Sequence, residues 1–265
     1  MEIIKINDSD YERYEQLLLK RDELEKDAGS IMTAYIKEFG TLIRVSFEKQ
    51  IACIRLKKEI RWCQAAINRG ESINRDLMLD TIRAEMEDYE KRLRQMTEEN
   101  KKALRSKISD EATVLEVKRI YRRIAKLIHP DINPKTEDTS ELMELWNRTV
   151  SAYHVNNLKE IQELEVLVTK ALDDMGEGKI RIIIPDIRMK IAKLQKEIEY
   201  IRSTPPFTYK DILISSEKTE DKKEELQNEI REYEEYAETL KNILDHILSH
   251  GNAKIVWTID GHDEK

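Results

Sequence analysis

Long runs of apolar residues, spaced alternately three and four apart, are the feature that most limits what this chain of 265 residues can fold into. This spacing places apolar side chains along one face of a helix, and a sustained run makes the seam of a coiled coil. The clearest runs are Leu79, Ile82, Met86, Tyr89, Leu93, Met96 and Ala103; Ile187, Ile191, Leu194, Ile198 and Ile201; and Leu226, Ile230, Tyr233, Ala237, Leu240, Leu244 and Ile247. We therefore predict an all-α fold built mainly from long helical hairpins.

The overall composition supports this fold class and excludes others. Charged residues make up 37% of the chain and aromatic residues 6%, with seven Gly and five Pro, which suits long helices better than sheets. No apolar run approaches the roughly 20 residues that cross a bilayer, and the first residues lack a signal-peptide pattern. The net charge of −7 argues against general binding of nucleic acid, which needs a broad basic surface. We therefore expect a cytoplasmic protein that binds neither a membrane nor nucleic acid.

The N-terminal part of the chain predicts one long helical hairpin. Residues 8–68 keep an approximate heptad phase, and the helix either continues through Gly40 with a weak point there or breaks at that glycine. A turn at residues 68–72 separates this segment from a helix at 75–108, which would be about 50 Å long at 1.5 Å per residue. We expect the two helices to pack antiparallel.

The C-terminal part predicts a second hairpin with short strands at its base. Helices at 187–201 and 217–249 are expected to pack antiparallel, joined by a segment that turns at two prolines. Residues 179–184 and 253–260 alternate like strands, so we expect them to pair, with Ile3–Ile6 as a candidate third strand. The heptads fit closure within one chain or between two copies, so a homodimer stays open.

One segment, residues 116–134, carries charge that points toward a partner. On helical spacing it has an apolar face and a cationic face, and it runs into His129, Pro130 and Asp131. Because Pro130 disfavours helical geometry in the residue before it, we expect the helix to end at Ile128 or His129. The apolar face consists of Val117, Ile120, Tyr121, Ile124, Leu127 and Ile128, and the cationic face of Lys118, Arg119, Arg122, Arg123 and Lys126. Such a local reversal of sign in an acidic chain can steer an acidic partner onto one face.

This segment resembles the second helix and signature loop of the J-domain (DnaJ-like) co-chaperones, without a gap from Glu116 to Pro134. The likeness continues upstream at residues 109–113, which are similar to that family's lead-in to the helix. It also continues downstream at Ala152 and Tyr153, in a helix that is expected to start near Ser140 like the family's third helix.

The resemblance covers roughly residues 97–172, and the flanking arms resemble no family that we recognise. It divides the chain into an N-terminal helical arm at 1–108, a J-like module at 109–172 and a C-terminal helical hairpin with short terminal strands at 173–265.

The resemblance implies a co-chaperone that docks on a DnaK-type chaperone and stimulates its ATPase. The cationic face would meet an acidic surface of that chaperone, and His129, Pro130 and Asp131 would trigger hydrolysis there. Catalysis would then belong to the partner, while the helical arms would hold an unknown client protein.

Two features depart from the family's pattern. The family usually carries Lys directly after the Asp, where this chain has Ile132. The family also has a separate first helix, whose place falls here on residues 97–108, so we predict that this helix is fused to the end of the preceding arm. Both departures favour a competing hypothesis, in which a structural or adaptor protein keeps the J-like helices only for packing. The co-chaperone hypothesis requires four side chains to be accessible to solvent: Arg122, Lys126, His129 and Asp131.

Other candidate sites are weaker. His246 and His250 have a spacing that can bind zinc, but Ile247 stands where a metalloprotease needs its Glu, and no third ligand is evident. Cys53 and Cys63 form no Cys-x-x-Cys pair and are expected to be core thiols. Since no nucleophile and base can be paired from the sequence, we predict no metal, no cofactor and no enzymatic activity.

The turn at Pro205 and Pro206 carries Phe207 and Tyr209. Aromatic residues beside such a turn can grip a partner, although covering the end of a hairpin is the commoner use. These two residues are therefore a secondary prediction for a partner-binding tip.

Overall fold

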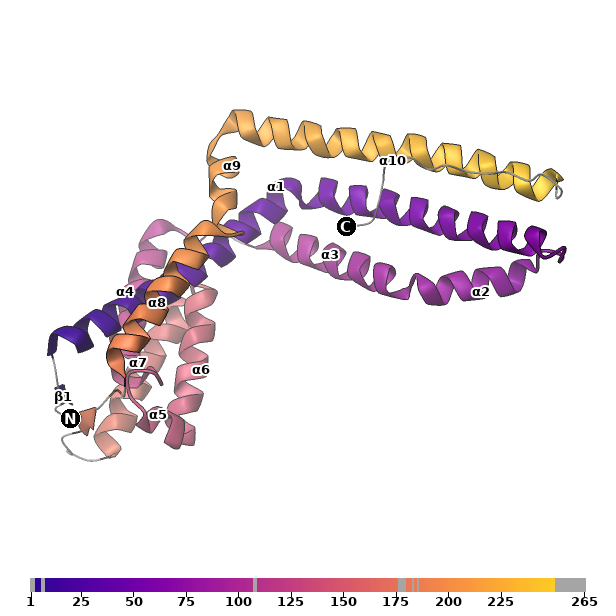
Figure 1. The fold of residues 1–265 in the computed structure, drawn as a ribbon. Helices are drawn as coiled ribbons and strands as arrows, with labels where there is room; N and C mark the ends of the chain where they lie inside the picture. The colour runs from indigo at the N-terminus through magenta and orange to yellow at the C-terminus, as the bar shows by residue number, and fades with distance from the viewer. Residues whose placement is uncertain are drawn as a thin grey trace. The chain divides into compact units, whose positions relative to one another are not determined.

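The computed structural model of the protein describes residues 3–5, 8–106, 109–175, 180–182, 184 and 186–250. Nearly all of these residues are helical, which confirms the predicted all-α class. The elements are β1 (Ile3–Lys5), α1 (Asp8–Asn68), α2 (Arg75–Glu85), α3 (Glu87–Arg105), α4 (Glu111–Ile128), α5 (Lys135–Asp138), α6 (Ser140–His154), α7 (Leu158–Asp174), β2 (Ile180–Ile182), α8 (Ile187–Ser203), the 3₁₀ helix η1 (Phe207–Tyr209), α9 (Lys210–Ile214) and α10 (Ser216–His250) (Figure 1). None of the helices within these ranges is both long and apolar enough to cross a membrane.

The chain divides into two compact units, each built from both ends of the sequence. Unit 1 comprises residues 1–33 and 106–210, and unit 2 comprises residues 34–105 and 211–265. Helix α1 continues through Gly40 without a break and contributes to both units. The compact units therefore differ from the three consecutive segments that the sequence indicated, because α1 is long enough to pack with different helices along its length.

The first predicted hairpin is found in unit 2. Asn100 Nδ2 on α3 donates a hydrogen bond to Thr41 Oγ1 on α1 at 3.2 Å, and Arg55 on α1 pairs with Glu90 on α3 at 2.7 Å. Residue numbers rise along α1 as they fall along its partner, so the helices are antiparallel. One buried cluster of this unit consists of Ile51, Cys63, Met78, Ile82, Met86, Leu244 and Ile247.

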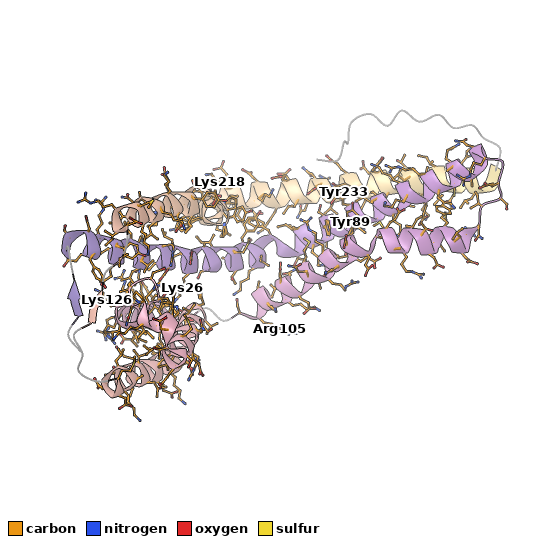
Figure 2. The ribbon with its side chains drawn as sticks, turned by 60° about the horizontal axis from the view of Figure 1, so that its bottom comes forward. Lys26, Tyr89, Arg105, Lys126, Lys218 and Tyr233 are labelled. Carbon is orange, nitrogen blue, oxygen red and sulfur yellow. The ribbon has the colours of Figure 1, made fainter. Side chains whose placement is uncertain are left out.

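The helix expected at 75–108 differs in two details. It is divided at Met86 into α2 and α3. Its buried face begins with Met78, while Leu79, expected in the seam, is exposed. Cys53 and Cys63 are free and buried, as predicted, and the Cys53 thiol lies 3.3 Å from the carbonyl oxygen of Tyr233. Figure 2 labels Tyr233 on α10.

The two helices of the second predicted hairpin belong to different compact units. Helix α8 belongs to unit 1 and packs on the first part of α1, whereas α10 belongs to unit 2 and packs on the second part. Lys223 on α10 pairs with Glu38 on α1 at 2.6 Å, and Glu234 pairs with Lys49 at 2.8 Å, so α10 runs parallel to α1. The apolar seams of both segments exist as expected, but each is covered by α1.

A short parallel pairing joins β1 to β2, with Ile3 opposite Ile180 and Lys5 opposite Ile182. The sequence indicated that residues 179–184 would pair with residues 253–260, and that second segment lies outside the described residues.

Gly40 marks a close approach between α1 and α3 in unit 2. A Cβ atom added there would lie 2.9 Å from Ile36 Cγ2 and 3.2 Å from Asn100 Oδ1. Asn100 is itself buried and held by Thr41. At Gly29, by contrast, an added Cβ atom would meet nothing within 4 Å.

We expect Gly40→Leu to lower the free energy of unfolding by about 1 to 3 kcal/mol, because the new side chain must displace Ile36 and Asn100. Gly29→Leu is the matched control and should be neutral or stabilising by up to about 1 kcal/mol, since Leu is the better helix former. Urea denaturation followed by circular dichroism measures both, and equal effects would contradict the close approach.

Candidate partner-docking site on unit 1

Helix α4 is fixed at both ends by local chemistry. At its start, the Asp110 carboxylate accepts hydrogen bonds from the Thr113 N–H at 2.9 Å and the Thr113 O–H at 2.7 Å. The helix ends at Ile128, as predicted, and His129 follows with extended backbone before Pro130. The whole of the predicted apolar face is buried except Leu127, which is partly buried.

Three helices, α4, α6 and α7, pack against one another and bury this face (Figure 1). The Tyr121 ring on α4 stacks on the Tyr153 ring on α6 with centroids 3.9 Å apart. Residues 97–105, where the sequence placed a fused first J helix, belong to unit 2, and residues 107 and 108 lie outside the described part. In unit 1 it is α7 that covers both α4 and α6.

The corner after α4 holds His129 inside and presents Asp131 outside. The His129 side chain is only 5% exposed, and its ring centroid lies 4.5 Å from that of Trp146. The backbone N–H of Asp131 donates a hydrogen bond to His129 Nδ1 at 3.0 Å, so the neutral ring carries its proton on Nε2. The Asp131 side chain is 46% exposed.

Burial lowers the pKa of His129 to about 4, although the charges of Asp22 and Asp131 act in the opposite direction and Arg21 acts with burial. Protonation of Nδ1 would also break the bond from the Asp131 N–H. The corner is therefore built around a neutral imidazole.

Ile132 anchors the corner to the rest of unit 1. It is fully buried in a cluster with Tyr11, Tyr14 and Leu18 of α1 and with Ile191 and Leu194 of α8. A Lys here, which is what the family usually carries, would place a charge in that cluster. The departure from the family's pattern thus has a packing reason.

The cationic face of α4 is paired with carboxylates of α1. Lys118 Nζ lies 2.9 Å from Glu23 Oε2, and Arg122 Nε donates to Glu23 Oε1 at 2.7 Å. Lys126 Nζ lies 2.7 Å from Glu15 Oε1 (Figure 2). Glu23 is 4% exposed, whereas Arg122 and Lys126 remain 48% and 53% exposed.

Glu23 stays charged at this buried position. Burial acts to raise the pKa of Glu23, but hydrogen bonds and charge from Lys118 and Arg122 outweigh it, so that pKa lies below its ordinary value. The remaining two cations pair within the bundle: Arg119 with Glu116 at 2.9 Å, and Arg123 with Glu165 on α7 at 2.9 Å.

Asp22 completes what we call the acidic strip of α1, namely Glu15, Asp22 and Glu23. The buried Asp22 carboxylate accepts a hydrogen bond from the Tyr121 O–H at 2.7 Å and one from Arg21 Nη2 at 2.8 Å. Its Oδ2 atom lies 3.7 Å from His129 Nε2. Asp22 therefore touches both α4 and the corner.

Lys26 fixes the same part of α1 on α6. Its ammonium group lies 3.9 Å from the centroid of the Tyr153 ring and donates a hydrogen bond to Asn156 Oδ1 at 2.6 Å (Figure 2). Burial lowers the pKa of Lys26 to about 8. This contact lies beyond the acidic strip along α1.

The four side chains that the co-chaperone hypothesis requires to be accessible do not behave alike. Arg122, Lys126 and Asp131 keep about half of their surface exposed, while His129 is buried. The acidic strip was missed at the sequence level. Its signal was the recurrence of carboxylates seven and eight residues apart on α1, matching the cations four apart on α4.

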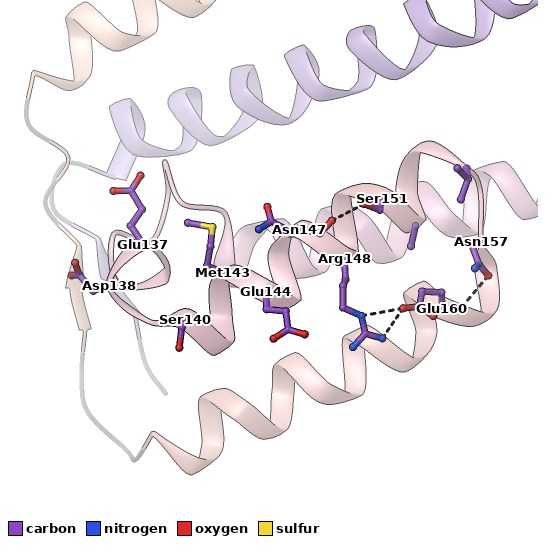
Figure 3. Close-up of a pocket in the computed structure, with 12 residues that line it drawn as sticks. Glu137, Asp138, Ser140, Met143, Glu144, Asn147, Arg148, Ser151, Asn157 and Glu160 are labelled. Atoms are coloured by element: carbon purple, nitrogen blue, oxygen red, sulfur yellow. Dashed lines mark hydrogen bonds and ion pairs between the residues drawn. The ribbon is translucent and has the colours of Figure 1, made fainter. Parts of the chain in front are cut away.

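Open grooves lie on unit 1, and two of them flank the helices described above. One, of about 490 Å³, follows the seam between α1 and α4 and is lined by Glu15, Leu19, Arg122 and Lys126 among others. The other, of about 860 Å³, follows α6 between α5 and the start of α7, where Arg148 bonds Glu160 at 2.6 Å (Figure 3). No residue of the corner lines the second groove.

The secondary candidates are placed as follows. Phe207 and Tyr209 form η1, which packs on α8, and both side chains are partly buried. His246 lies on α10 in unit 2. Within the described part of the chain, no three His, Cys, Asp or Glu side chains gather as metal ligands would.

Comparison of the chain with protein-family models, with curated proteins and with solved structures found no match in any of the three.

We expect the stability of unit 1 to fall as the pH drops from 7 to 5. The folded pKa of His129, about 4, lies below its ordinary value of 6.5, so the unfolded chain binds the proton more readily between these values. The loss should be roughly 2 kcal/mol.

Thermal and urea unfolding at pH 7 and pH 5 measure this dependence. His129→Gln, which does not titrate and can still accept the bond from the Asp131 N–H, should remove most of it. His154→Gln changes an exposed histidine of the same unit and should leave it intact. A wild-type slope shared by His129→Gln would contradict a buried neutral His129.

Proposed function

We propose that unit 1 acts as a J-type co-chaperone module, which docks on a DnaK-type chaperone in the cytoplasm and stimulates the ATPase of that chaperone. The observation that carries the proposal is the corner at the end of α4. There Asp131 is half exposed, while its own N–H bonded to His129 and the buried Ile132 beside it fix its position.

The cationic helix and the corner divide the work. Lys118, Arg122 and Lys126 are the groups that an acidic surface would contact, beginning with the exposed parts of Arg122 and Lys126. Asp131 then shifts the partner's conformational equilibrium, because it contacts the hydrolysis-competent state better than the resting state. Hydrolysis takes place in the partner, and we propose no enzymatic activity for this chain.

The helices of unit 2 provide surface for a client or a second partner. Leu77 and Leu79 on α2 and Leu104 on α3 are large apolar side chains that are exposed to solvent. Exposed apolar residues on a helical arm are suitable contact points for an apolar client segment or for a second copy of the chain.

The second candidate function is a structural or adaptor protein with a degenerate J-like module. The burial of His129 and the pairing of three cations with α1 favour it, because both remove groups that docking would use. Asp131 serves either function: its side chain is 46% exposed, as docking requires, and its Oδ2 atom lies 3.9 Å from Arg21 Nη1 of α1, a contact that a packing module would use.

We expect the protein to raise the steady-state ATPase rate of a DnaK-type chaperone, and we expect Asp131→Asn to reduce that stimulation about tenfold or more, which corresponds to about 1.4 kcal/mol of lost differential contact. Asp173→Asn is the matched control, because it removes the same charge from an exposed position at the end of α7. It should stimulate like the wild type.

The adaptor function would be favoured instead if neither the wild type nor the Glu15→Gln/Glu23→Gln variant described below changed the ATPase rate. Equal stimulation by wild type and Asp131→Asn would separate docking from the corner and contradict the proposed role of Asp131.

A further inference from the structure

The acidic strip of α1 occupies the groups that an acidic partner would need. Glu23 takes up both Lys118 and Arg122, and Glu15 takes up Lys126. An ammonium or guanidinium group that is already bonded to a carboxylate offers a second carboxylate little further attraction. The strip and a partner's acidic surface therefore compete for the same side chains.

We propose that the first part of α1, residues 8–33, is a built-in competitor that closes the docking face of α4, and that an acidic partner surface binds after displacing it. This inference rests on the proposed function and adds its regulation. The displaced carboxylates are replaced by those of the partner, so the cations exchange one set of acidic groups for another.

Three kinds of contact hold the closed state. Hydrogen bonds run from the Tyr121 O–H to Asp22 at 2.7 Å and from Lys26 to Asn156 at 2.6 Å. Ion pairs join the strip to cations that are half exposed, and such pairs are weakened by water and salt. Apolar contacts join Ile132 to Tyr11, Tyr14 and Leu18. Ile132, which stands where the family usually carries Lys, is thus an apolar contact that holds α1 on the corner.

The bundle does not depend on this part of α1 for its core. Helices α4, α6 and α7 supply all the buried residues of the cluster except Leu19, which is the single buried contribution of α1 among the described residues. Displacement of α1 therefore removes Leu19 from this cluster and keeps the contacts of α4 with α6 and α7.

The seam offers a partner a place to begin. The groove of about 490 Å³ between α1 and α4 exposes Arg122 and Lys126 from one side. A partner can contact Lys126 while Glu23 still holds Lys118. Binding then proceeds along α4 as the strip is released, and the apparent affinity equals the intrinsic affinity multiplied by the fraction of molecules that are open.

The first experiment frees the face by removing charge from the strip. The full-length wild type, Glu15→Gln, Glu23→Gln and the double variant are titrated with a DnaK-type ATPase domain by calorimetry, with ATPase stimulation measured in parallel. We expect affinity to rise in that order, reaching about tenfold in the double variant. Asp27→Asn, an exposed carboxylate on the same part of α1, is the control and should bind like the wild type.

The outcomes separate this inference from the proposed function. If the wild type and the double variant bind the ATPase domain equally and stimulate it equally, α1 is not a competitor, while the co-chaperone function is unaffected. No stimulation by any variant would overturn the function itself. Circular dichroism checks folding, and Glu15→Gln, which leaves the pairs of Glu23 with Lys118 and Arg122 intact, keeps the series interpretable if the double variant loses helix.

Two further measurements test independently whether the partner displaces α1. Ile132→Lys removes the apolar contact with α1 and restores the charge usual in the family, so it should also raise affinity. Hydrogen exchange on the unmodified chain should show residues 9–30 losing protection when the ATPase domain is added. Unchanged protection of these amides in the bound state would overturn displacement, whatever the variants do.

Discussion

A carboxylate that loses its water must be neutralised by fixed positive charge, and in unit 1 this condition applies to Glu23. It is almost fully buried, and Lys118 and Arg122 approach it from successive turns of α4. Removing either cation would leave a buried charge incompletely paired, which costs more than the pair itself contributes. The position of α1 on α4 is therefore specified by charge, while the apolar clusters on either side supply most of the favourable burial.

This pairing gives α4 two occupied faces. The apolar face is covered by α6 and α7, and the cationic face is covered in part by α1, so the helix is enclosed although half of its cationic surface can still be reached by water. The corner follows the same division. His129 and Ile132 point into packed surroundings, and Asp131 between them remains outside.

Features set by neighbouring residues could be predicted from the sequence. Pro130 determines where α4 ends, and the spacing of Val117, Ile120 and Ile124 determines which side of the helix is buried. Features set by distant residues could not. The spacing of apolar residues along a helix does not show which helix will cover them. The segments containing α8 and α10 were therefore expected to pair with each other, whereas each packs against α1. The acidic strip was hidden for the same reason, because its carboxylates look like a solvated helix surface until the cations of α4 are placed beside them.

Each unit contains segments that are far apart in the sequence, so the order of translation determines which partner segments exist first. Helix α1 is translated before α4, so its acidic strip is already present when the cations of α4 emerge about a hundred residues later. The strip that pairs with the cations of α4 is therefore made before α8, the last α-helix of unit 1. Shielding of the cationic helix requires no segment translated after it, whereas the cluster around Ile132 is complete only once α8 has been made.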